Sequence, residues 1–375
     1  MIYNGGKYNQ HWSTKKLSEL GTFSRGVSKH RPRNDTRLFE NGKYPLIQTG
    51  DIKEANLYVT SHSQEYGEFG LKQSKLWDKG TLCITIAANI AETAILAYPM
   101  CFPDSVVGFN ANSNESSELF MYYVFEYIRN SIQNSASGSI QDNINIEYLT
   151  GLNFKVPDKQ NQDKITNLLG VIDGKILLNR KINDNLQSQL RLIYENMIAK
   201  ANSNQIKGNF VTVKEMADIT TGKEDANFST VNGKYKFFTC SNVPLQCDEY
   251  AFESSSILIA GNGDFNVKYY SGKFNAYQRT YVLTASSEYY AILYLACLYQ
   301  VNLFKSNSSG SIVKFITKSD VENIPLFIPD DISLLQKLNN LLHFQEQNIL
   351  ENDKLIQLRD FLLPMLMNGQ ATIDN

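Results

Sequence analysis

The carboxylates that come nearest to a catalytic set follow a proline before the middle of the chain. Pro157, Asp158, Asp173 and Lys175 have the residue types of a metal-dependent nuclease, in which carboxylates converge on one cation. Asp158 precedes a segment of helical periodicity, and Asp173 lies inside it, about 22 Å away by helical rise. Because carboxylates so far apart cannot share a cation, we expect no phosphodiester cleavage by this string.

Loops that hold cofactors are also missing from the sequence. Gly261 and Gly263 form a lone Gly-x-Gly, which is more typical of a turn between strands than of a dinucleotide or S-adenosylmethionine site. No Gly-x-x-x-x-Gly-Lys-Ser/Thr loop for ATP occurs. We therefore predict a chain that is not an enzyme, with no catalytic residues and no cofactor of its own.

Cysteines and histidines give no metal or disulfide pattern. The five cysteines (Cys83, Cys101, Cys240, Cys247 and Cys297) form no Cys-x-x-C pair, and the four histidines are scattered. Free, buried cysteines are typical of a reducing cytoplasm. The amino-terminal residues lack the apolar core of a signal peptide, and no apolar run approaches the ~18–20 residues that span a bilayer. We expect a cytoplasmic protein with no metal and no membrane contact.

Overall composition limits the possible architecture but does not indicate a binding partner. The chain has 375 residues, enough for two domains, and its 21 Tyr and 20 Phe favour strands. The net charge of −2 gives no reason to expect nucleic acid. A local run differs, because Ser24–Arg37 contains Arg25, Lys29, Arg31, Arg33 and Arg37 against one acid, Asp35. Such a run is either a solvated loop or a surface that contacts phosphates.

The elements that would position these residues occur twice. Residues 135–158 and 306–330 both contain Ser-Gly-Ser-Ile, then a polar stretch, then an apolar-alternating run closed by Pro-Asp. Residues 12–26 match 210–223, which predicts a turn of amphipathic helix running into a glycine loop in each. Two further pairs, 44–52 with 235–243 and 79–89 with 254–264, predict strands followed by polar loops. We therefore predict two β-rich modules.

After each Pro-Asp the periodicity becomes that of a heptad seam. The first seam comprises Ile165, Leu169, Ile172, Ile176, Asn179, Asn183, Leu186, Leu190, Ile193 and Met197. The second comprises Leu335, Leu338, Leu342, Gln345, Ile349, Asn352, Ile356, Arg359 and Leu363. Two such seams at matching places in a repeat predict a pair of long helices.

This ordered set resembles the specificity subunit of type I restriction–modification systems over nearly the whole chain, from about Trp12 to Gly369. The resemblance is carried by "YPLIQTGDI", "CITIAANIAETAIL", the two "SGSI" passages and the Pro-Asp junctions. It implies an α+β fold in which two β-rich target-recognition domains are joined by two long antiparallel coiled-coil helices, with a pseudo-two-fold internal repeat. The corresponding divisions are 1–157, 158–203, 204–330 and 331–375.

The resemblance also implies a function. Each module would bind one half of a bipartite, asymmetric target in double-stranded DNA, while methyltransferase and restriction subunits dock on the chain. Adenine methylation and ATP-dependent cleavage would belong to those partners, which use S-adenosylmethionine, ATP and Mg²⁺. The chain itself has no Pro-Pro pair, and hence no Asn/Asp-Pro-Pro-aromatic methyltransferase motif. The second module departs most, because "FTCSNV" lacks the Gly50-Asp51 pair of the first.

Amides, guanidinium groups and hydroxyls read base edges, and Lys and Arg hold the phosphates. In the first module the candidates are Gln48, Thr49, Asp51, Asn89, Gln141 and Asn143 for bases, and Arg25, Lys29, Arg31 and Arg33 for phosphates. In the second they are Thr239, Ser241, Asn242, Asn262 and Gln278 for bases, and Lys223, Arg279, Lys314 and Lys318 for phosphates. The Ser-Gly-Ser passages are expected to be turns that approach the DNA closely.

In an antiparallel, pseudo-two-fold helix pair, equivalent residues meet only at the midpoint. We therefore expect Asn179 and Asn352, where both seams turn polar, to face one another and fix the register. One alternative is a non-enzymatic adaptor, in which two modules on a coiled-coil rod bind protein or carbohydrate. Another, a fused nuclease-methyltransferase, is disfavoured by the missing motifs. The basic run favours DNA, and salt-dependent binding to duplex DNA distinguishes the adaptor.

Overall fold

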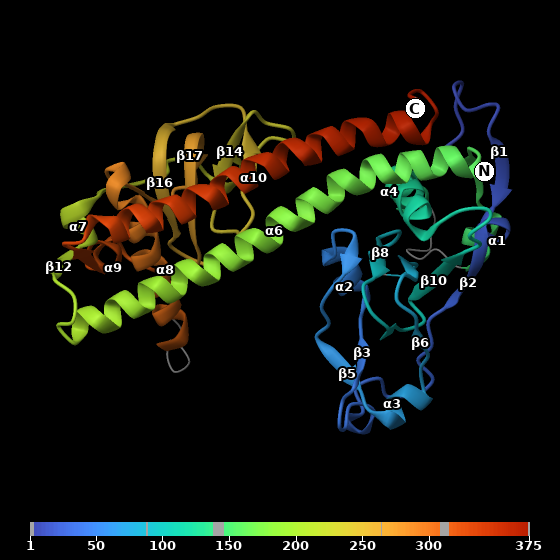
Figure 1. The fold of residues 1–375 in the computed structure, drawn as a ribbon, viewed down its shortest axis with the longest axis horizontal. Coiled ribbons are helices and arrows are strands. Elements are labelled where there is room, and N and C mark those ends of the chain that lie inside the picture. The colour runs from blue at the N-terminus through green and yellow to red at the C-terminus, as the bar shows by residue number, and fades with distance from the viewer. Residues whose placement is uncertain (1–3, 88, 138–145, 264, 308–314, 374–375) are drawn as a thin grey trace. The chain divides into compact units, whose positions relative to one another are not determined.

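The computed structural model describes residues 4–87, 89–137, 146–263, 265–307 and 315–373 (Figure 1). The chain divides into two compact units, which are Met1–Leu177 with Asp353–Asn375 (unit 1) and Leu178–Asn352 (unit 2). Each unit contains one β-rich module and a part of each of two long helices, α6 (Lys159–Asn202) and α10 (Ile332–Met367). The expected α+β architecture is confirmed. The four-part division by residue number stays a prediction, because the compact units cut across both helices.

The first module is built on a five-stranded sheet in the order β2-β10-β7-β8-β4. Its strands are β2 (Gly21–Arg25), β10 (Val106–Ala111), β7 (Leu82–Thr85), β8 (Thr93–Leu96) and β4 (Tyr58–Val59). A second sheet contains β5 (Gln64–Tyr66), β3 (Tyr44–Leu46), β9 (Met100–Cys101) and β6 (Leu76–Trp77), and β1 (Ser13–Lys16) pairs with β11 (Asn153–Val156). The helices are α1 (Leu17–Leu20), α2 (Thr49–Glu54), α3 (Glu68–Lys72), α4 (Glu118–Ser137) and α5 (Ile146–Gly151).

The second module is built on a six-stranded sheet in the order β13-β18-β16-β17-β14-β15. Its strands are β13 (Asp218–Thr221), β18 (Thr280–Thr284), β16 (Phe252–Ala260), β17 (Val267–Ala276), β14 (Tyr235–Phe238) and β15 (Leu245–Cys247). Outside this sheet, β12 (Gly208–Thr212) pairs with β19 (Pro325–Pro329). The helices are α7 (Val213–Met216), α8 (Tyr290–Asn307) and α9 (Lys318–Glu322).

Burial explains why the central strands and one helix of the modules are apolar along most of their length. All four residues of β7 are buried, and so are the last five of β16, which is why both read as continuous apolar runs. Helix α4 packs on β7, β8 and β10, and α8 packs on β16 and β17. Residues 291–297 of α8 are buried on every side of the helix, so this helix lacks the polar face of a surface helix.

The two modules share one topology, which confirms the internal repeat. The order β2-β10-β7-β8 in the first corresponds to β13-β18-β16-β17 in the second. Gly26 donates its N–H to the Val106 carbonyl over 2.8 Å, and Gly222 donates to the Thr280 carbonyl over 3.1 Å. A Cβ on Gly26 would lie 2.3 Å from the Pro103 carbonyl oxygen, and one on Gly222 would lie 2.0 Å from that of Ala276. Glycine is therefore required at the same point of each module.

Two local expectations were wrong. The segments 12–26 and 210–223 do not begin with helix, because a strand (β1 or β12) precedes each short helix and another (β2 or β13) follows it. The antiparallel pairs β1–β11 and β12–β19 span the modules' ends, a long-range constraint that a local pattern does not contain. The polar residues after β3 are the first turn of α2 and not a simple turn, because Asp51 caps that helix by accepting the Gln48 N–H over 2.6 Å.

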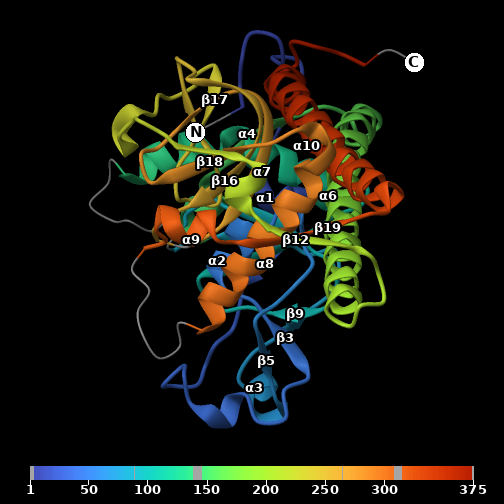
Figure 2. The ribbon, with the colours of Figure 1, turned by 90° about the vertical axis from the view of Figure 1, so that its left-hand side faces the viewer.

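Helices α6 and α10 lie side by side and run antiparallel (Figures 1 and 2). In unit 2 Asn179 Nδ2 donates to Asn352 Oδ1 over 3.0 Å, so the two asparagines meet as the heptads predict. Asn183 and Gln345 each donate to the other's backbone carbonyl, over 3.2 and 2.8 Å. These hydrogen bonds between amide side chains define the register of α6 against α10 in this structure. That the asparagines fix the register in solution stays a prediction.

Ile349 is not a seam residue as expected, because its side chain is 39% exposed. Asn348 occupies this part of the seam instead and donates to Asn183 Oδ1 over 2.8 Å. An α-helix with 3.6 residues per turn drifts from a strict heptad, and amides that need partners favour the position that supplies one. The midpoint is therefore a cluster of amides and not a single polar pair.

Each module attaches a tyrosine to a carboxylate on a long helix. In unit 1 the Tyr123 hydroxyl donates to Asp173 over 2.6 Å, and Arg359 lies 3.1 Å from the same carboxylate. This pairing explains Asp173 as a structural residue. In unit 2 Tyr290 donates to Glu346 over 3.1 Å, and the basic partner of Glu346 among the described residues is the exposed His343, 3.8 Å away. Burial raises the pKa of Glu346, because its charged form loses solvation.

The two carboxylates should respond oppositely to neutralisation. Glu346→Gln keeps an acceptor for Tyr290 and removes a buried charge, so it should stabilise unit 2 by about 1 kcal/mol at pH 8. Because a raised pKa leaves Glu346 protonated in acid, this gain should vanish as the pH falls to about 4.3. Asp173→Asn leaves Arg359 without its buried partner and should cost about 3 kcal/mol. Calorimetric unfolding at both pH values checks this, and equal shifts for the two variants would contradict it.

Candidate nucleic-acid interface

Loops of the second module converge at one end of its sheet. Gly261, after β16, donates its N–H to the Arg279 carbonyl over 2.8 Å, just before β18. Gln278 donates its N–H to the Glu224 carbonyl over 3.0 Å, which brings in the loop after β13. Asn266 Nδ2 donates to the Cys240 carbonyl over 2.8 Å, which brings in the loop after β14. The candidates Lys223, Thr239, Ser241, Asn242, Asn262, Gln278 and Arg279 all lie in these loops.

A hollow of about 440 Å³ opens at this end of the sheet. It is lined by Gly261, Gln278, Arg279, Tyr281, Phe315, Ile316, Thr317 and Lys318. Three of the predicted contact residues, Gln278, Arg279 and Lys318, therefore share one concave surface. Phe315, 57% exposed, was not predicted; its only sequence signal is an aromatic residue after the repeated Ser-Gly-Ser-Ile passage.

The candidate base readers differ in their exposure and in the hydrogen bonds that they make. Ser241 and Asn242 are exposed, whereas Thr239 is 8% exposed and its hydroxyl accepts the Ser241 N–H over 3.3 Å. Thr239 thus stabilises the turn in this conformation. The Gln278 amide donates to Asp225 over 2.8 Å, which leaves its carbonyl oxygen as an acceptor. Base contact by any of them stays a prediction.

The first module places its candidates at the equivalent end. Arg25 ends β2 and is exposed, and Asn89 lies in the loop between β7 and β8. Ile86 donates to the Ser105 carbonyl over 2.9 Å, the same bond that Gly261 makes to Arg279 in the second module. Lys53 of α2 donates to Asn89 Oδ1 over 3.2 Å, which joins the helix that Gln48, Thr49 and Asp51 begin to this loop.

The basic run is partly neutralised by acids that the sequence did not suggest. Arg33 lies 2.6 Å from Asp104, and Arg31 lies 3.8 Å from the same carboxylate. Arg37 and His30 both bond Asp35; these bonds, the one from Arg37 first, hold the pKa of Asp35 far below its ordinary value. Arg25 and Lys29 are exposed and have no side-chain ion pair within the described ranges.

Arg31 and Arg33 should raise the affinity for duplex DNA of any sequence. Replacing both with Ala should weaken binding to every duplex and lower the slope of log K against log [salt] by about one for each phosphate that the variant no longer neutralises. Arg37→Ala is the matched control, because Arg37 is an arginine of the same run that is not among the predicted phosphate contacts. Asp104→Asn should tighten binding, because it frees both arginines. Fluorescence anisotropy from low to moderate salt measures the slopes. An unchanged slope in the double variant would mean that Arg31 and Arg33 do not contact phosphates.

Several candidates lie outside the described residues: Gln141, Asn143, Lys314 and the central residues of both Ser-Gly-Ser passages. No cluster of three His, Cys, Asp or Glu side chains that could hold a metal occurs within the described ranges. Four cysteines are buried and Cys240 is partly exposed. Among the helices that the structure describes, none is long and apolar enough to cross a membrane.

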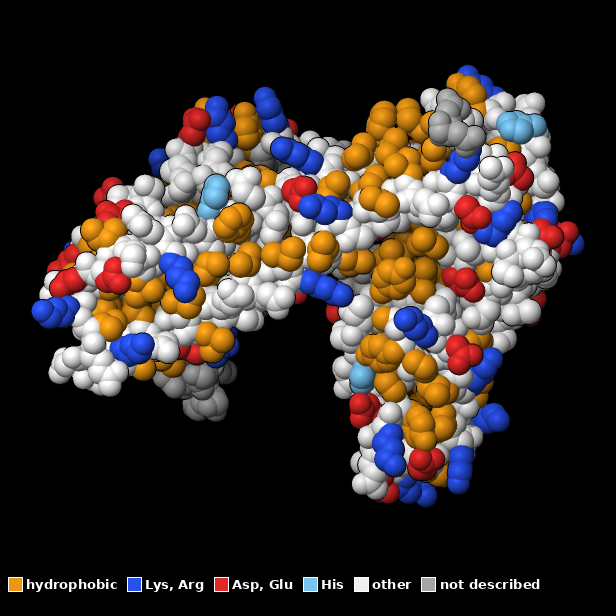
Figure 3. All heavy atoms as spheres, viewed as in Figure 1, with side chains coloured by type: hydrophobic (Ala, Val, Ile, Leu, Met, Phe, Trp, Pro, Cys, Tyr) orange, Lys and Arg blue, Asp and Glu red, His pale blue; other side chains and the backbone are white. Residues whose placement is uncertain are grey.

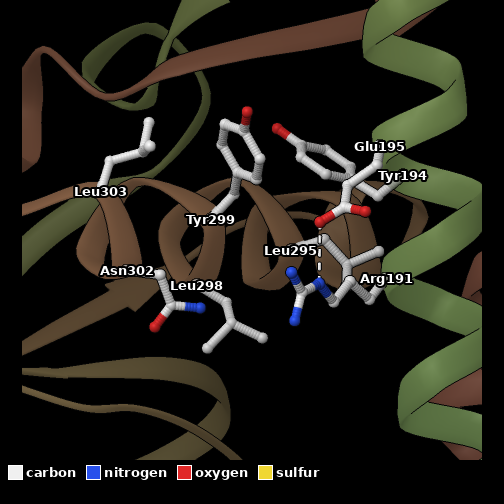
Figure 4. A pocket seen from close by; sticks show the side chains of 8 residues that line it. All are labelled: Arg191, Tyr194, Glu195, Leu295, Leu298, Tyr299, Asn302 and Leu303. Carbon is white, nitrogen blue, oxygen red and sulfur yellow. Dashed lines mark hydrogen bonds and ion pairs between the residues drawn. The ribbon is translucent and has the colours of Figure 1, made fainter. Parts of the chain in front are cut away.

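Exposed apolar side chains also occur along both long helices (Figure 3). In unit 1 Val171 is 72% exposed and Phe361 60%, and in unit 2 Leu192 is 65% exposed and Phe344 61%. In unit 2, α6 and α8 also border a hollow of about 220 Å³ lined mainly by Tyr194, Leu295, Leu298, Tyr299 and Leu303 (Figure 4). The ion pair between Arg191 and Glu195, 2.7 Å long, lies at its edge.

Comparison with known proteins agrees with this architecture. A family model of the type I restriction modification DNA specificity domain matches residues 9–188 and again 205–358. The chain therefore belongs to the family of type I restriction–modification specificity subunits, the non-catalytic components that carry target recognition.

Three relatives illustrate the range of similarity. The EcoDI specificity subunit of Escherichia coli is 35% identical over 169 residues, which is 43% of this chain and only 38% of that subunit. The MjaIX specificity subunit of Methanocaldococcus jannaschii is 21% identical over 98% of this chain and 95% of its own length. The crystal structure of an S subunit from M. genitalium has a TM-score of 0.61 at 19% identity, covering 98% of this chain and 99% of that one. This last likeness supports the fold.

Proposed function

We propose that this chain reads a bipartite, asymmetric sequence in double-stranded DNA, with one half read by each module. The observation that carries the proposal is the placement of loops rich in amides and basic residues at the same end of both repeated sheets. A shared scaffold with different loops suits two readers of different sequence. Arg25 and Lys29 in the first module, and Arg279 and Lys318 in the second, would hold phosphates or bases on either half.

Methyltransferase and restriction subunits would supply the chemistry. We infer that they use S-adenosylmethionine, ATP and Mg²⁺, and that this chain holds none of these in the cytoplasm where the complex would work. The exposed apolar residues on α6 and α10 support docking of the methyltransferase subunits on the helices, since such side chains on a helix pair gain stability when a partner covers them. The hollow between α6 and α8 offers a further apolar contact for that partner.

Salt-dependent DNA binding tests the proposal against the adaptor alternative. The purified chain, alone and with its modification subunit, is titrated onto labelled random-sequence duplex at several salt concentrations. Phosphate contacts release counterions, so affinity should fall steeply as salt rises. An adaptor for protein or carbohydrate would show no DNA binding, or binding without this slope.

A further inference from the structure

Phe315 lines the hollow of unit 2, which also has cationic side chains in its lining. A single exposed apolar residue needs no explanation on a protein surface. Phe315 differs because it lines a concave surface together with Arg279 and Lys318, at the end of the sheet where the reading loops converge. An apolar ring in such a place can contact the edge of a base but cannot hydrogen-bond to it.

The backbone holds Arg279 and Phe315 close to one glycine. Gly261 donates its N–H to the Arg279 carbonyl, and its own carbonyl accepts the Ile316 N–H, each over 2.8 Å. Asn262 and Phe315 form an antiparallel bridge, and the Tyr281 hydroxyl donates to the Ile316 carbonyl over 3.0 Å. A Cβ on Gly261 would lie 2.7 Å from the Arg279 carbonyl oxygen, so glycine permits this close packing. The segments of Arg279 and Phe315 therefore each lie one strand spacing, about 5 Å, from the segment of Gly261 and Asn262.

The side chains of Arg279 and Phe315 carry complementary chemistry. The Arg279 guanidinium is exposed and has no ion pair with any described residue, so its parallel N–H groups are available for the O6 and N7 acceptors of a guanine. The Phe315 ring suits the C5-methyl group that only thymine presents in the major groove. Lys318, 59% exposed and 3.8 Å from Glu322, can reach a flanking phosphate.

We propose that this hollow reads a thymine beside a guanine in one half of the DNA target. Phe315 contacts the thymine methyl group, and Arg279 binds the guanine edge instead of the phosphate that the sequence suggested. Because the two backbone segments are at most about 10 Å apart, the side chains of Arg279 and Phe315 can reach adjacent base pairs, which are about 3.4 Å apart along the helix. The inference depends on the proposed function of unit 2 as a DNA reader.

Removing one methyl group from the DNA tests this contact. The full chain, with its modification subunit, first selects its target from a random duplex library. Each thymine of the selected target is then replaced in turn by deoxyuridine, which lacks only the C5-methyl group. One replacement, next to a guanine, should weaken wild-type binding about fourfold, the effect of one buried methyl-sized group. Phe315→Ala should bind the thymine and uracil duplexes equally.

Matched variants separate this contact from loss of apolar surface or of fold. Val231 is 93% exposed and precedes β14, at the opposite end of that strand from the reading loops, so Val231→Ala should keep the preference for thymine. Arg279→Lys should lose roughly tenfold or more of the preference for the neighbouring guanine.

The possible failures are distinguishable. A split target without a thymine–guanine step, a target in which no uracil weakens binding, or a Phe315→Ala variant that still prefers thymine would overturn this inference alone. If the chain selected no sequence at all, the proposed function would fail, and this inference with it.

Discussion

Exchanging residues 209–329 for the equivalent module of another family member should replace one half of the DNA target and leave the other half unchanged. All described reading loops of the second module lie within this stretch, including those that border the hollow. The exchange should preserve the fold, because β12 pairs with β19. Asn209 lies opposite Ile328, so the two ends of the exchanged segment lie side by side in one pair of strands. Selection from a random duplex library, or sequencing of methylated adenines, gives the target before and after.

The reciprocal exchange is the control. Residues 13–156 are closed in the same way, by the pairing of Ser13 with Val156 in β1 and β11. Replacing them should change the opposite half of the target. If either exchange altered both halves of the target together, the modules would not recognise the two half-sites independently, and the repeat would not correspond to two recognition units.

Adding one heptad to both long helices should lengthen the unread spacer between the half-sites. Insertion between Leu177 and Leu178 and between Asn352 and Asp353 falls where the two compact units divide, so each unit keeps its own contacts. A heptad adds about 10 Å of helix, or about three base pairs at roughly 3.4 Å each, and preserves the seam. Both half-sites should therefore stay the same while the selected spacer grows by about three base pairs.

Insertion into α6 alone is the matched control for this prediction. It shifts the part of α6 before Leu178 by one heptad against α10, so the Asp173–Arg359 pair of unit 1 and the Asn179–Asn352 pair of unit 2 no longer fit one register; it should lower thermal stability and remove a defined spacer. An unchanged spacer after the double insertion would mean that the helices do not set the separation of the half-sites.

The repeat made much of this fold predictable. Features that recur in both halves, such as Gly26 and Gly222 or the heptad seams, are visible in the sequence because each copy supports the interpretation of the other. The meeting of Asn179 and Asn352 followed from symmetry, since equivalent positions of an antiparallel pair coincide only at its midpoint. The family and its function came from the order of these features and not from one motif.

Pairings between distant segments were not visible. No local pattern shows that β1 pairs with β11, that Asp104 lies beside Arg31 and Arg33, or that Gly261 holds Arg279 and Phe315 together. Ile349 was misplaced because it is apolar and falls on the heptad spacing, while the choice of Asn348 depends on Asn183 across the helix pair. Contacts of this kind are decided by tertiary packing, which a single sequence does not specify.

Reconstituted methylation tests the central claim most directly. The purified chain, its modification subunit and the mixture are each incubated with radiolabelled S-adenosylmethionine and a plasmid library of random duplex sites. The mixture alone should methylate adenine, at one split asymmetric sequence, and the purified chain should transfer no label. Methylation by this chain without its partner, or methylation by the partner at the same sequence without this chain, would contradict its assignment as the subunit that selects the target.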